Sequence, residues 1–97
     1  GLGLVPGANI GDKCAVFEAV HGSAPDIAGK NLANPCAQVL SAALMLRYSF
    51  GLEEAAASIE KAVEGAIRDG LRTIDVAQGT PSIGTREMGQ AIASCLE

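Results

Sequence analysis

The sequence of 97 residues predicts an α/β fold in which two early strands are followed by about three helices. Two short apolar runs in the first 20 residues are typical of strands, and the segments after residue 35 have the apolar spacing of helices. Two strands make a poor sheet by themselves. The pattern therefore indicates part of a larger α/β sheet, within a single unit no larger than one domain.

The strands are predicted at residues 2–5 and 14–20. The first is expected to end at Pro6 and Gly7, because these residue types commonly interrupt regular structure. The second is apolar, and the acidic Glu18 within it is expected to face a cleft. Gly1 and Gly3 form a Gly-x-Gly pattern, but a loop follows them instead of a helix, which disfavours a Rossmann-type nucleotide turn.

A buried helix is predicted at residues 36–50. Asn34 and Pro35 are a strong start signal, because Asn accepts a hydrogen bond from an N–H that a helix leaves unpaired, whereas Pro has no N–H. The helix is apolar on nearly every face, so we expect it to be buried on several sides. Gly51 is predicted to stop it.

A second, amphipathic helix is predicted at residues 53–69 and ends at Gly70. An extended segment at 71–76 and a loop at 78–81 follow. Thr85 is predicted to cap a last amphipathic helix that runs to about residue 96. The expected apolar stripe of the second helix consists of Leu52, Ala55, Ala56, Ile59, Val63, Ala66 and Ile67.

Composition excludes several classes of function. A net charge of -4, seven Lys plus Arg and 3% aromatic residues argue against a nucleic-acid-binding protein. No apolar run reaches the roughly 18 residues of a membrane span, and the first residues show no sign of a secretion signal. Cys14, Cys36 and Cys95 form no Cys-x-x-Cys pair, which predicts reduced, buried thiols in a cytoplasmic protein.

The chemistry of the sequence concentrates in residues 17–35, which contain the only histidine together with Ser, Asp, Lys and two Asn. Loops between rigid elements commonly carry binding groups. The backbone around Gly22 suits an anion, and Asp26 suits the vicinal hydroxyls of a ribose. His21 and Ile27 suit a planar base. Each residue also has a purely structural explanation, such as a turn or a helix cap, and both interpretations remain open at this point.

The segment Val-Phe-Glu-Ala-Val-His-Gly-Ser-Ala-Pro-Asp-Ile-Ala-Gly-Lys-Asn-Leu-Ala-Asn-Pro, at residues 16–35, resembles the cofactor loop of the β-decarboxylating dehydrogenases. This family includes isocitrate, 3-isopropylmalate and homoisocitrate dehydrogenases, and the resemblance extends over the whole chain. Residues 4–11 look more like the isocitrate branch, whereas residues 46–49 and the stretch from 72 to 89 look more like bacterial isopropylmalate enzymes.

The resemblance implies that residues 1–97 are a C-terminal part of the large, terminus-bearing domain, with a partial three-layer fold. It also implies an NAD-binding loop, in which Asp26 and Ile27 take the ribose-discriminating positions and His21 and Asn34 contact adenine. Glu18 would lie near the nicotinamide end. The cofactor contacts implied in this way are Leu2, Gly3, Glu18, His21, Gly22, Ser23, Ala24, Pro25, Asp26, Ile27 and Asn34.

The family reaction oxidises a 2-hydroxy acid and then decarboxylates it, with Mg²⁺ or Mn²⁺ bound. No metal or catalytic motif of the family matches this sequence, so we assign it no catalytic or metal-ligating residue. The favoured function is the dinucleotide-binding part of an NAD-dependent oxidative decarboxylase, of isocitrate first and 3-isopropylmalate next, inactive as an isolated chain. The alternatives are a non-catalytic fragment that binds an adenosine nucleotide or a partner, and a structural remnant. We also expect a homo-oligomer, because the unpaired strand edges and the apolar helix need a partner.

Overall fold

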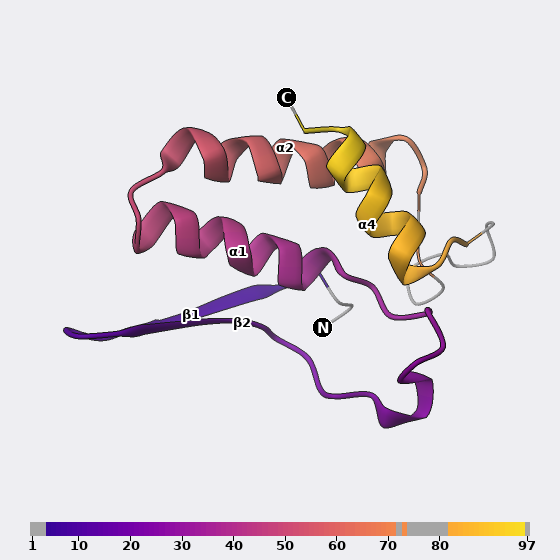
Figure 1. Cartoon of the computed structure of the whole chain (residues 1–97), viewed down its shortest axis with the longest axis horizontal. Helices are drawn as coiled ribbons and strands as arrows, with labels where there is room; N and C mark the ends of the chain where they lie inside the picture. The colour runs from indigo at the N-terminus through magenta and orange to yellow at the C-terminus, as the bar shows by residue number, and fades with distance from the viewer. Residues whose placement is uncertain (1–3, 72, 74–81, 97) are drawn as a thin grey trace.

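The computed structural model describes residues 4–71, 73 and 82–96. It confirms the predicted class, an α/β partial fold with two strands before three helices (Figure 1). The elements in chain order are β1 (Pro6–Ile10), β2 (Ala15–Ala19), the short 3-10 helix η1 (Pro25–Ile27), α1 (Cys36–Tyr48), α2 (Glu53–Arg68) and α4 (Thr85–Ser94).

The described elements stack in three layers. Helix α1 packs against both strands on one side and against α2 on the other, and α4 crosses the C-terminal part of α2 (Figure 1). This arrangement explains the apolar character of α1, since small buried residues such as Ala37, Ser41 and Ala43 let neighbours approach it closely. The Ser41 hydroxyl donates a hydrogen bond of 2.7 Å to the carbonyl of Ala37, so the buried polar group is satisfied.

The two strands form an antiparallel hairpin in which Pro6 pairs with Ala19 and Ile10 with Ala15. The second strand lies within its predicted range. The first prediction was wrong, because β1 begins at Pro6, where a break was expected. Each strand of a two-stranded sheet is an edge strand, and proline is tolerated at the first residue of such a strand. Residues 2 and 3 of the predicted strand lie outside the described residues.

The start and end of α1 follow the predicted signals with small shifts. The Cys36 N–H donates to Asn34 Oδ1 at 2.9 Å, as expected of a residue that starts the helix. The predicted positions were wrong by one residue, because Pro35 is the N-cap and Cys36 the first helical residue. The helix ends at Tyr48, two residues earlier than expected. Gly51 has a φ of +65°, a conformation that favours glycine, and it turns the chain towards α2.

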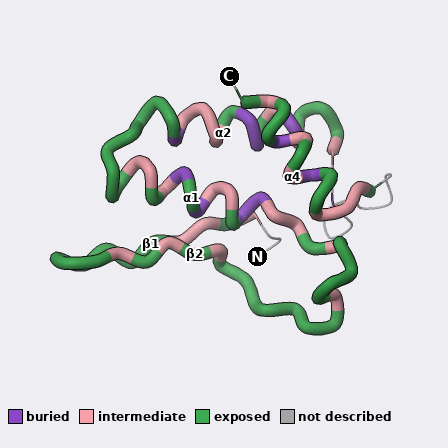
Figure 2. Tube along the Cα trace, in the orientation of Figure 1, coloured by how far each residue is buried: buried purple, intermediate pink, exposed green. Residues whose placement is uncertain are grey.

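The core lies where α2 meets α1 and α4. Its buried residues are Cys36, Ala62, Val63, Ala66, Met88 and Ile92. Figure 2 shows this burial along the facing helices, whereas the hairpin tip and the loop after β2 are exposed. Leu52 and Ala55 were expected in the buried stripe but are exposed, because α4 covers only the C-terminal part of α2.

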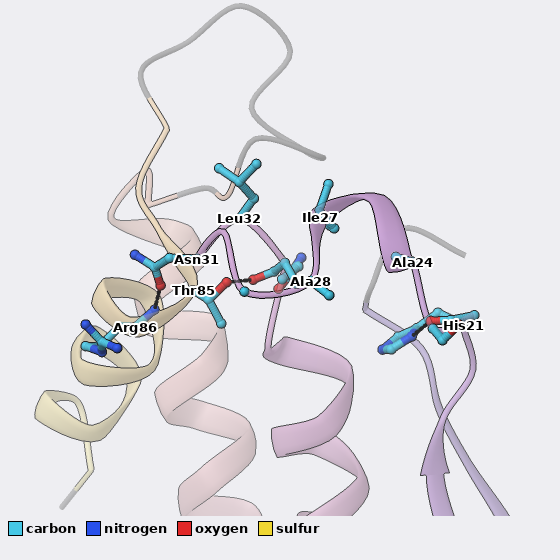
Figure 3. Close-up of a pocket in the computed structure, with 13 residues that line it drawn as sticks. His21, Ala24, Ile27, Ala28, Asn31, Leu32, Thr85 and Arg86 are labelled. Carbon is cyan, nitrogen blue, oxygen red and sulfur yellow. Dashed lines mark hydrogen bonds between the residues drawn. The ribbon is translucent and has the colours of Figure 1, made fainter.

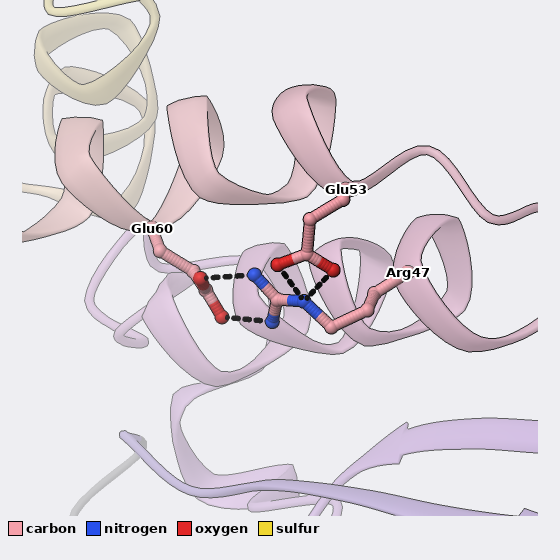
Figure 4. Close-up of polar contacts among 3 residues, drawn as sticks. All are labelled: Arg47, Glu53 and Glu60. Carbon is pink, nitrogen blue, oxygen red and sulfur yellow. Dashed lines mark hydrogen bonds and ion pairs between the residues drawn. The ribbon is translucent and has the colours of Figure 1, made fainter.

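Arg47 joins α1 to α2 by two ion pairs (Figure 4). Its Nη1 and Nη2 donate to the two carboxylate oxygens of Glu60, each at 2.7 Å, and its Nε donates to Glu53 at 2.8 Å. The hydrogen bonds to Glu60 and then Glu53 raise the pKa of Arg47, and the Arg47 guanidinium lowers the pKa of Glu60. The bidentate geometry is the favourable arrangement for a guanidinium and a carboxylate.

The three cysteines form no disulfide with one another, and they are not all buried as predicted. Cys36 is buried, Cys95 is half-buried, and Cys14 is exposed because the hairpin turn extends beyond α1. The predicted segments at 71–76 and 78–81 lie mostly outside the described residues. Only Leu71 and Thr73 of these segments are described, and Thr73 is buried. Within the described ranges, no helix is long and apolar enough to cross a membrane.

Candidate functional site

A cavity of about 680 Å³ lies between the loop after β2 and the first turn of α4 (Figure 3). Eleven of its lining residues belong to one segment, the 21–34 loop, and two come from α4. The lining residues are His21, Gly22, Ser23, Ala24, Ile27, Ala28, Gly29, Asn31, Leu32, Ala33, Asn34, Thr85 and Arg86. A single stretch of chain therefore builds most of the cavity, and a helix about 50 residues later closes one side.

Backbone turns give the 21–34 loop its shape. Ala24 and Asn31 have positive φ angles of 45° and 59°, and Gly29 has one of 77°. Between them, the N–H of Ile27 donates to the carbonyl of Ala24 at 3.1 Å, and the N–H of Lys30 donates to that of Ile27 at 3.1 Å. Left-handed residues on both sides of a 3-10 turn fold the chain back on itself, which leaves backbone as well as side chains facing the cavity.

His21 is exposed at the start of the loop. Its Nδ1 lies 2.8 Å from the carbonyl oxygen of Gly22. Because a carbonyl can only accept, this contact requires the proton on Nδ1, which leaves Nε2 of the neutral ring as a hydrogen-bond acceptor. The ring can then accept a hydrogen bond from an amino group of a ligand in the cavity.

Asn34 closes the loop where α1 begins. Its Oδ1 accepts the Cys36 N–H, so the structural role considered for this residue is present in the molecule. Asn34 also lines the cavity. Its capping oxygen therefore positions the residue at the cavity wall.

The start of α4 is tied to the 21–34 loop by four hydrogen bonds. Asn31 accepts the Thr85 N–H with its backbone carbonyl at 3.1 Å and the Arg86 N–H with its side-chain Oδ1 at 2.8 Å. Its Nδ2 donates to a carboxylate oxygen of Glu87 at 3.1 Å, and the Thr85 hydroxyl donates to the carbonyl of Ala33. Backbone hydrogen bonding at Glu87 itself, followed by the Asn31 amide, lowers the pKa of Glu87.

The prediction that Thr85 caps this helix was wrong by one position. Gly84 precedes the helix and Thr85 is its first residue, so the hydroxyl of Thr85 serves a contact with the loop instead of an N-terminal cap. Thr85 and Arg86 were not among the predicted site residues. The spacing of residues along the chain does not identify the loop 50 residues earlier as the partner of this helix start.

Six of the predicted contacts line the cavity, namely His21, Gly22, Ser23, Ala24, Ile27 and Asn34. Pro25 and Asp26 lie in η1 between lining residues, with Asp26 exposed and outside the lining set. Glu18 is exposed on β2 and does not line this cavity. Leu2 and Gly3 lie outside the described residues.

The donor set fits an uncharged or anionic ligand with a flat apolar part. Ile27, Ala28 and Leu32 provide apolar surface, and Arg86 adds one positive charge to the lining. In the part of the chain that the structure describes, no three His, Cys, Asp or Glu residues gather in a group that could hold a metal ion. The predicted absence of metal ligands remains a prediction.

A family model and curated relatives of this chain indicate the same family. A family model of isocitrate/isopropylmalate dehydrogenase matches residues 1–92. The 3-isopropylmalate dehydrogenase of Rhodopirellula baltica is 54% identical over 98 residues, which cover 98% of this chain and 27% of that protein. The 3-isopropylmalate dehydrogenase of Aquifex aeolicus is 52% identical over 97 residues, covering 99% of this chain and 27% of that protein.

Solved structures are similar over the same length. The crystal structure of isocitrate dehydrogenase from Methylococcus capsulatus has a TM-score of 0.91 and 50% identity, with 98% of this chain and 28% of that chain covered. A β-decarboxylating dehydrogenase from Thermococcus kodakarensis has a TM-score of 0.85 and 42% identity, with 97% and 26% covered. The chain thus spans about a quarter of the length of the curated relatives it matches. Because the family model covers almost all of its residues, this chain belongs to the isocitrate/isopropylmalate dehydrogenase family.

Proposed function

We propose that the chain is the adenosine-binding, C-terminal part of the large domain of an NAD-dependent enzyme that oxidises and decarboxylates a 2-hydroxy acid. The observation that carries the proposal is the cavity of about 680 Å³, which a single loop of the predicted motif builds almost alone. Cavities of this size are typical of small-molecule and cofactor sites.

The adenine end of NAD would lie at His21, Ile27 and Asn34. Nε2 of the neutral His21 ring would accept a hydrogen bond from the exocyclic amino group of adenine, since the contact with Gly22 fixes Nδ1 as the donor. Ile27 is half-buried and offers an apolar surface to the flat ring. Asn34, held by its contact with Cys36, would bring its polar groups to the edge of the base.

The ribose and phosphates would lie along the first turn of the loop. Gly22, Ser23 and Ala24 line the cavity. Backbone N–H groups in such a turn are suited to phosphate oxygens. Asp26 would accept hydrogen bonds from the two ribose hydroxyls and would repel the additional phosphate of NADP. Arg86 contributes a positive charge that favours the anionic dinucleotide.

When bound, NAD accepts a hydride from the carbon that carries the hydroxyl group of the substrate. Leu2, Gly3 and Glu18 remain predicted contacts towards its nicotinamide end. Mg²⁺ or Mn²⁺, the arginines that hold the substrate and the proton-transfer groups would be supplied by other parts of the enzyme. We place the enzyme in the cytoplasm as a homo-oligomer.

The substrate is proposed as isocitrate or 3-isopropylmalate. Residues 4–11 favour isocitrate, as does the solved isocitrate dehydrogenase with 50% identity. The curated relatives described above are 3-isopropylmalate dehydrogenases. An assay of the full-length enzyme with both acids decides between them, because the substrate-binding groups are expected outside this chain.

The cofactor proposal is tested in a chimera in which this chain replaces the matching segment of the Aquifex aeolicus enzyme. We expect calorimetry to show NAD binding, with NADP much weaker, and His21→Ala to weaken NAD binding. Lys13→Ala, in the exposed hairpin turn, serves as the matched control. Binding of AMP and NAD without turnover would favour the non-catalytic alternative. Absence of binding to any of the three nucleotides, in a folded chimera, would contradict the proposal.

A further inference from the structure

The first turn of α4 lacks a cap of its own. The residue before the helix is Gly84, which has no side chain to accept an N–H, and the structure gives it no side-chain cap. The cap comes from Asn31, whose Oδ1 accepts the Arg86 N–H at 2.8 Å. Asn31 Nδ2 completes the contact by donating to Glu87 at 3.1 Å (Figure 3 shows the bond between Asn31 and Arg86).

Gly84 is needed for this contact because of space. Its φ of −80° is open to any residue. A Cβ at this position, however, would lie 2.3 Å from Asn31 Nδ2, 2.4 Å from Glu87 Oε2 and 2.9 Å from the Asn31 carbonyl oxygen. One of these neighbours is backbone, so the clash cannot be relieved by a side-chain rotation alone. The chain is therefore built for the close approach of Asn31 to the helix.

The contact is separate from the packing that holds α4 in place. Met88 and Ile92 fix the helix against α2, with 2% and 4% of their surface exposed. Asn31 is exposed, and three of the residues that the contact brings together, Asn31, Thr85 and Arg86, line the cavity. Loss of the Asn31 amide would thus leave the helix packed, but it would remove two of the four hydrogen bonds that hold the loop at the wall that α4 provides.

We propose that Asn31 is a positioning residue that holds the 21–34 loop against the first turn of α4 and so keeps the cavity in the shape that binds the adenosine half of NAD. The inference rests on the proposed function. An exposed loop without this contact spends part of its time away from α4. The apparent affinity for NAD then falls by the fraction of molecules that retain the binding shape.

The test uses the full-length enzyme, with steady-state kinetics for NAD and for the hydroxy acid. Asn31→Gly keeps the left-handed backbone without strain and removes the amide. We expect it to raise KM for NAD about five- to tenfold, in line with the loss of a capping contact. Because the proposed function places this loop at the adenosine half of NAD, kcat and KM for the hydroxy acid should stay within about twofold. Gln38→Ala, which removes an exposed amide from α1, is the control.

A rescue pair separates positioning from general structure. Asn31→Asp keeps an acceptor for the Arg86 N–H but places a carboxylate beside that of Glu87, so KM for NAD should rise at least as much as for Asn31→Gly. Adding Glu87→Gln restores a donor and acceptor pair, and KM for NAD should fall back towards that of the wild type.

Three results would overturn the inference. Unchanged KM for NAD in Asn31→Gly would show that the contact does not shape the cavity. A fall in kcat with similar rises in KM for NAD and for the hydroxy acid, together with a lower melting temperature, would show that Asn31 has a general structural role. A wild-type enzyme that binds no adenosine nucleotide would overturn the proposed function and this inference with it. The binding measurement on the wild type alone distinguishes this failure from a failure of the inference about Asn31.

Discussion

Replacement of Asp26 by Lys and Ile27 by Tyr is expected to move cofactor preference from NAD towards NADP. Asp26 is exposed within η1, and Ile27 lines the cavity one residue later. Lysine at position 26 exchanges a repulsive charge for an attractive one, and tyrosine at position 27 adds a hydroxyl donor. Both changes are made on an exposed turn, so the fold should tolerate them.

The size of the effect follows from the exposure of Asp26. Two unit charges about 4 Å apart in water interact by about 1 kcal/mol, and salt weakens this further. A phosphate group carries a charge of about −1.5 to −2. Reversing one facing charge then changes the relative binding of NADP by roughly 2 kcal/mol after screening, which corresponds to about 30-fold in the ratio of kcat/KM for the two cofactors.

The assay compares kcat/KM for NAD and NADP in the full-length enzyme. Asp26→Asn removes only the repulsion, so about half of the logarithmic shift is expected from it. Lys30→Ala is a useful control, because it alters the charge of the same loop at a residue that does not line the cavity. A cofactor ratio that is the same in wild type and in the double variant would refute the placement of Asp26 beside the ribose.

Four further outcomes are expected. The isolated chain of 97 residues should form no NADH from isocitrate, 3-isopropylmalate or homoisocitrate with Mg²⁺, and a metal-dependent rise in absorbance from pure chain would contradict this. Arg47→Met should lower the melting temperature, with a smaller effect in high salt. Arg47 lowers the pKa of Glu60, so the difference in melting temperature between wild type and Arg47→Met should be present above pH 4.5, the ordinary pKa of glutamate. The difference should disappear as the pH falls well below that value. Met88→Ala, at a core residue with 2% exposure, should cost about 2–5 kcal/mol in urea unfolding. Sedimentation equilibrium of the chain should show a dimer, and a mass near 9.8 kDa at every concentration would refute it.

The helices could be predicted from the sequence, because apolar periodicity and the residues that start and end a helix act locally. Gly51 and Gly70 have positive φ angles after α1 and α2, as their positions predict. The first strand was misplaced because proline and glycine were treated as breakers without regard to the sheet. At an edge, Pro6 lacks no necessary hydrogen bond, and Gly7 leaves room where a Cβ would lie 2.9 Å from the side chain of Val20.

The site could be predicted from the sequence only in part. The polar residues of the 21–34 loop are consecutive, so their gathering around one cavity could be predicted from the stretch itself. Thr85 and Arg86 could not, because their place depends on how α4 packs on α2. One signal was present at the start of α4: Gly84 and Glu87 have the spacing of a capping box that lacks its Ser or Thr. Such a gap indicates a cap supplied from elsewhere in the fold.

The loop that builds the cavity is fixed to the packed layers at three points. The loop leaves the hairpin just after the contact between the Val20 N–H and the Val5 carbonyl, and it ends at the capped start of α1. Both ends are therefore fixed on packed layers, since α1 contacts both strands and α2. Asn31 fixes the middle of the loop to α4, which Met88 and Ile92 in turn hold against α2. A loop fixed at three points loses little entropy when a ligand binds, which favours the dinucleotide binding that we propose for this exposed segment.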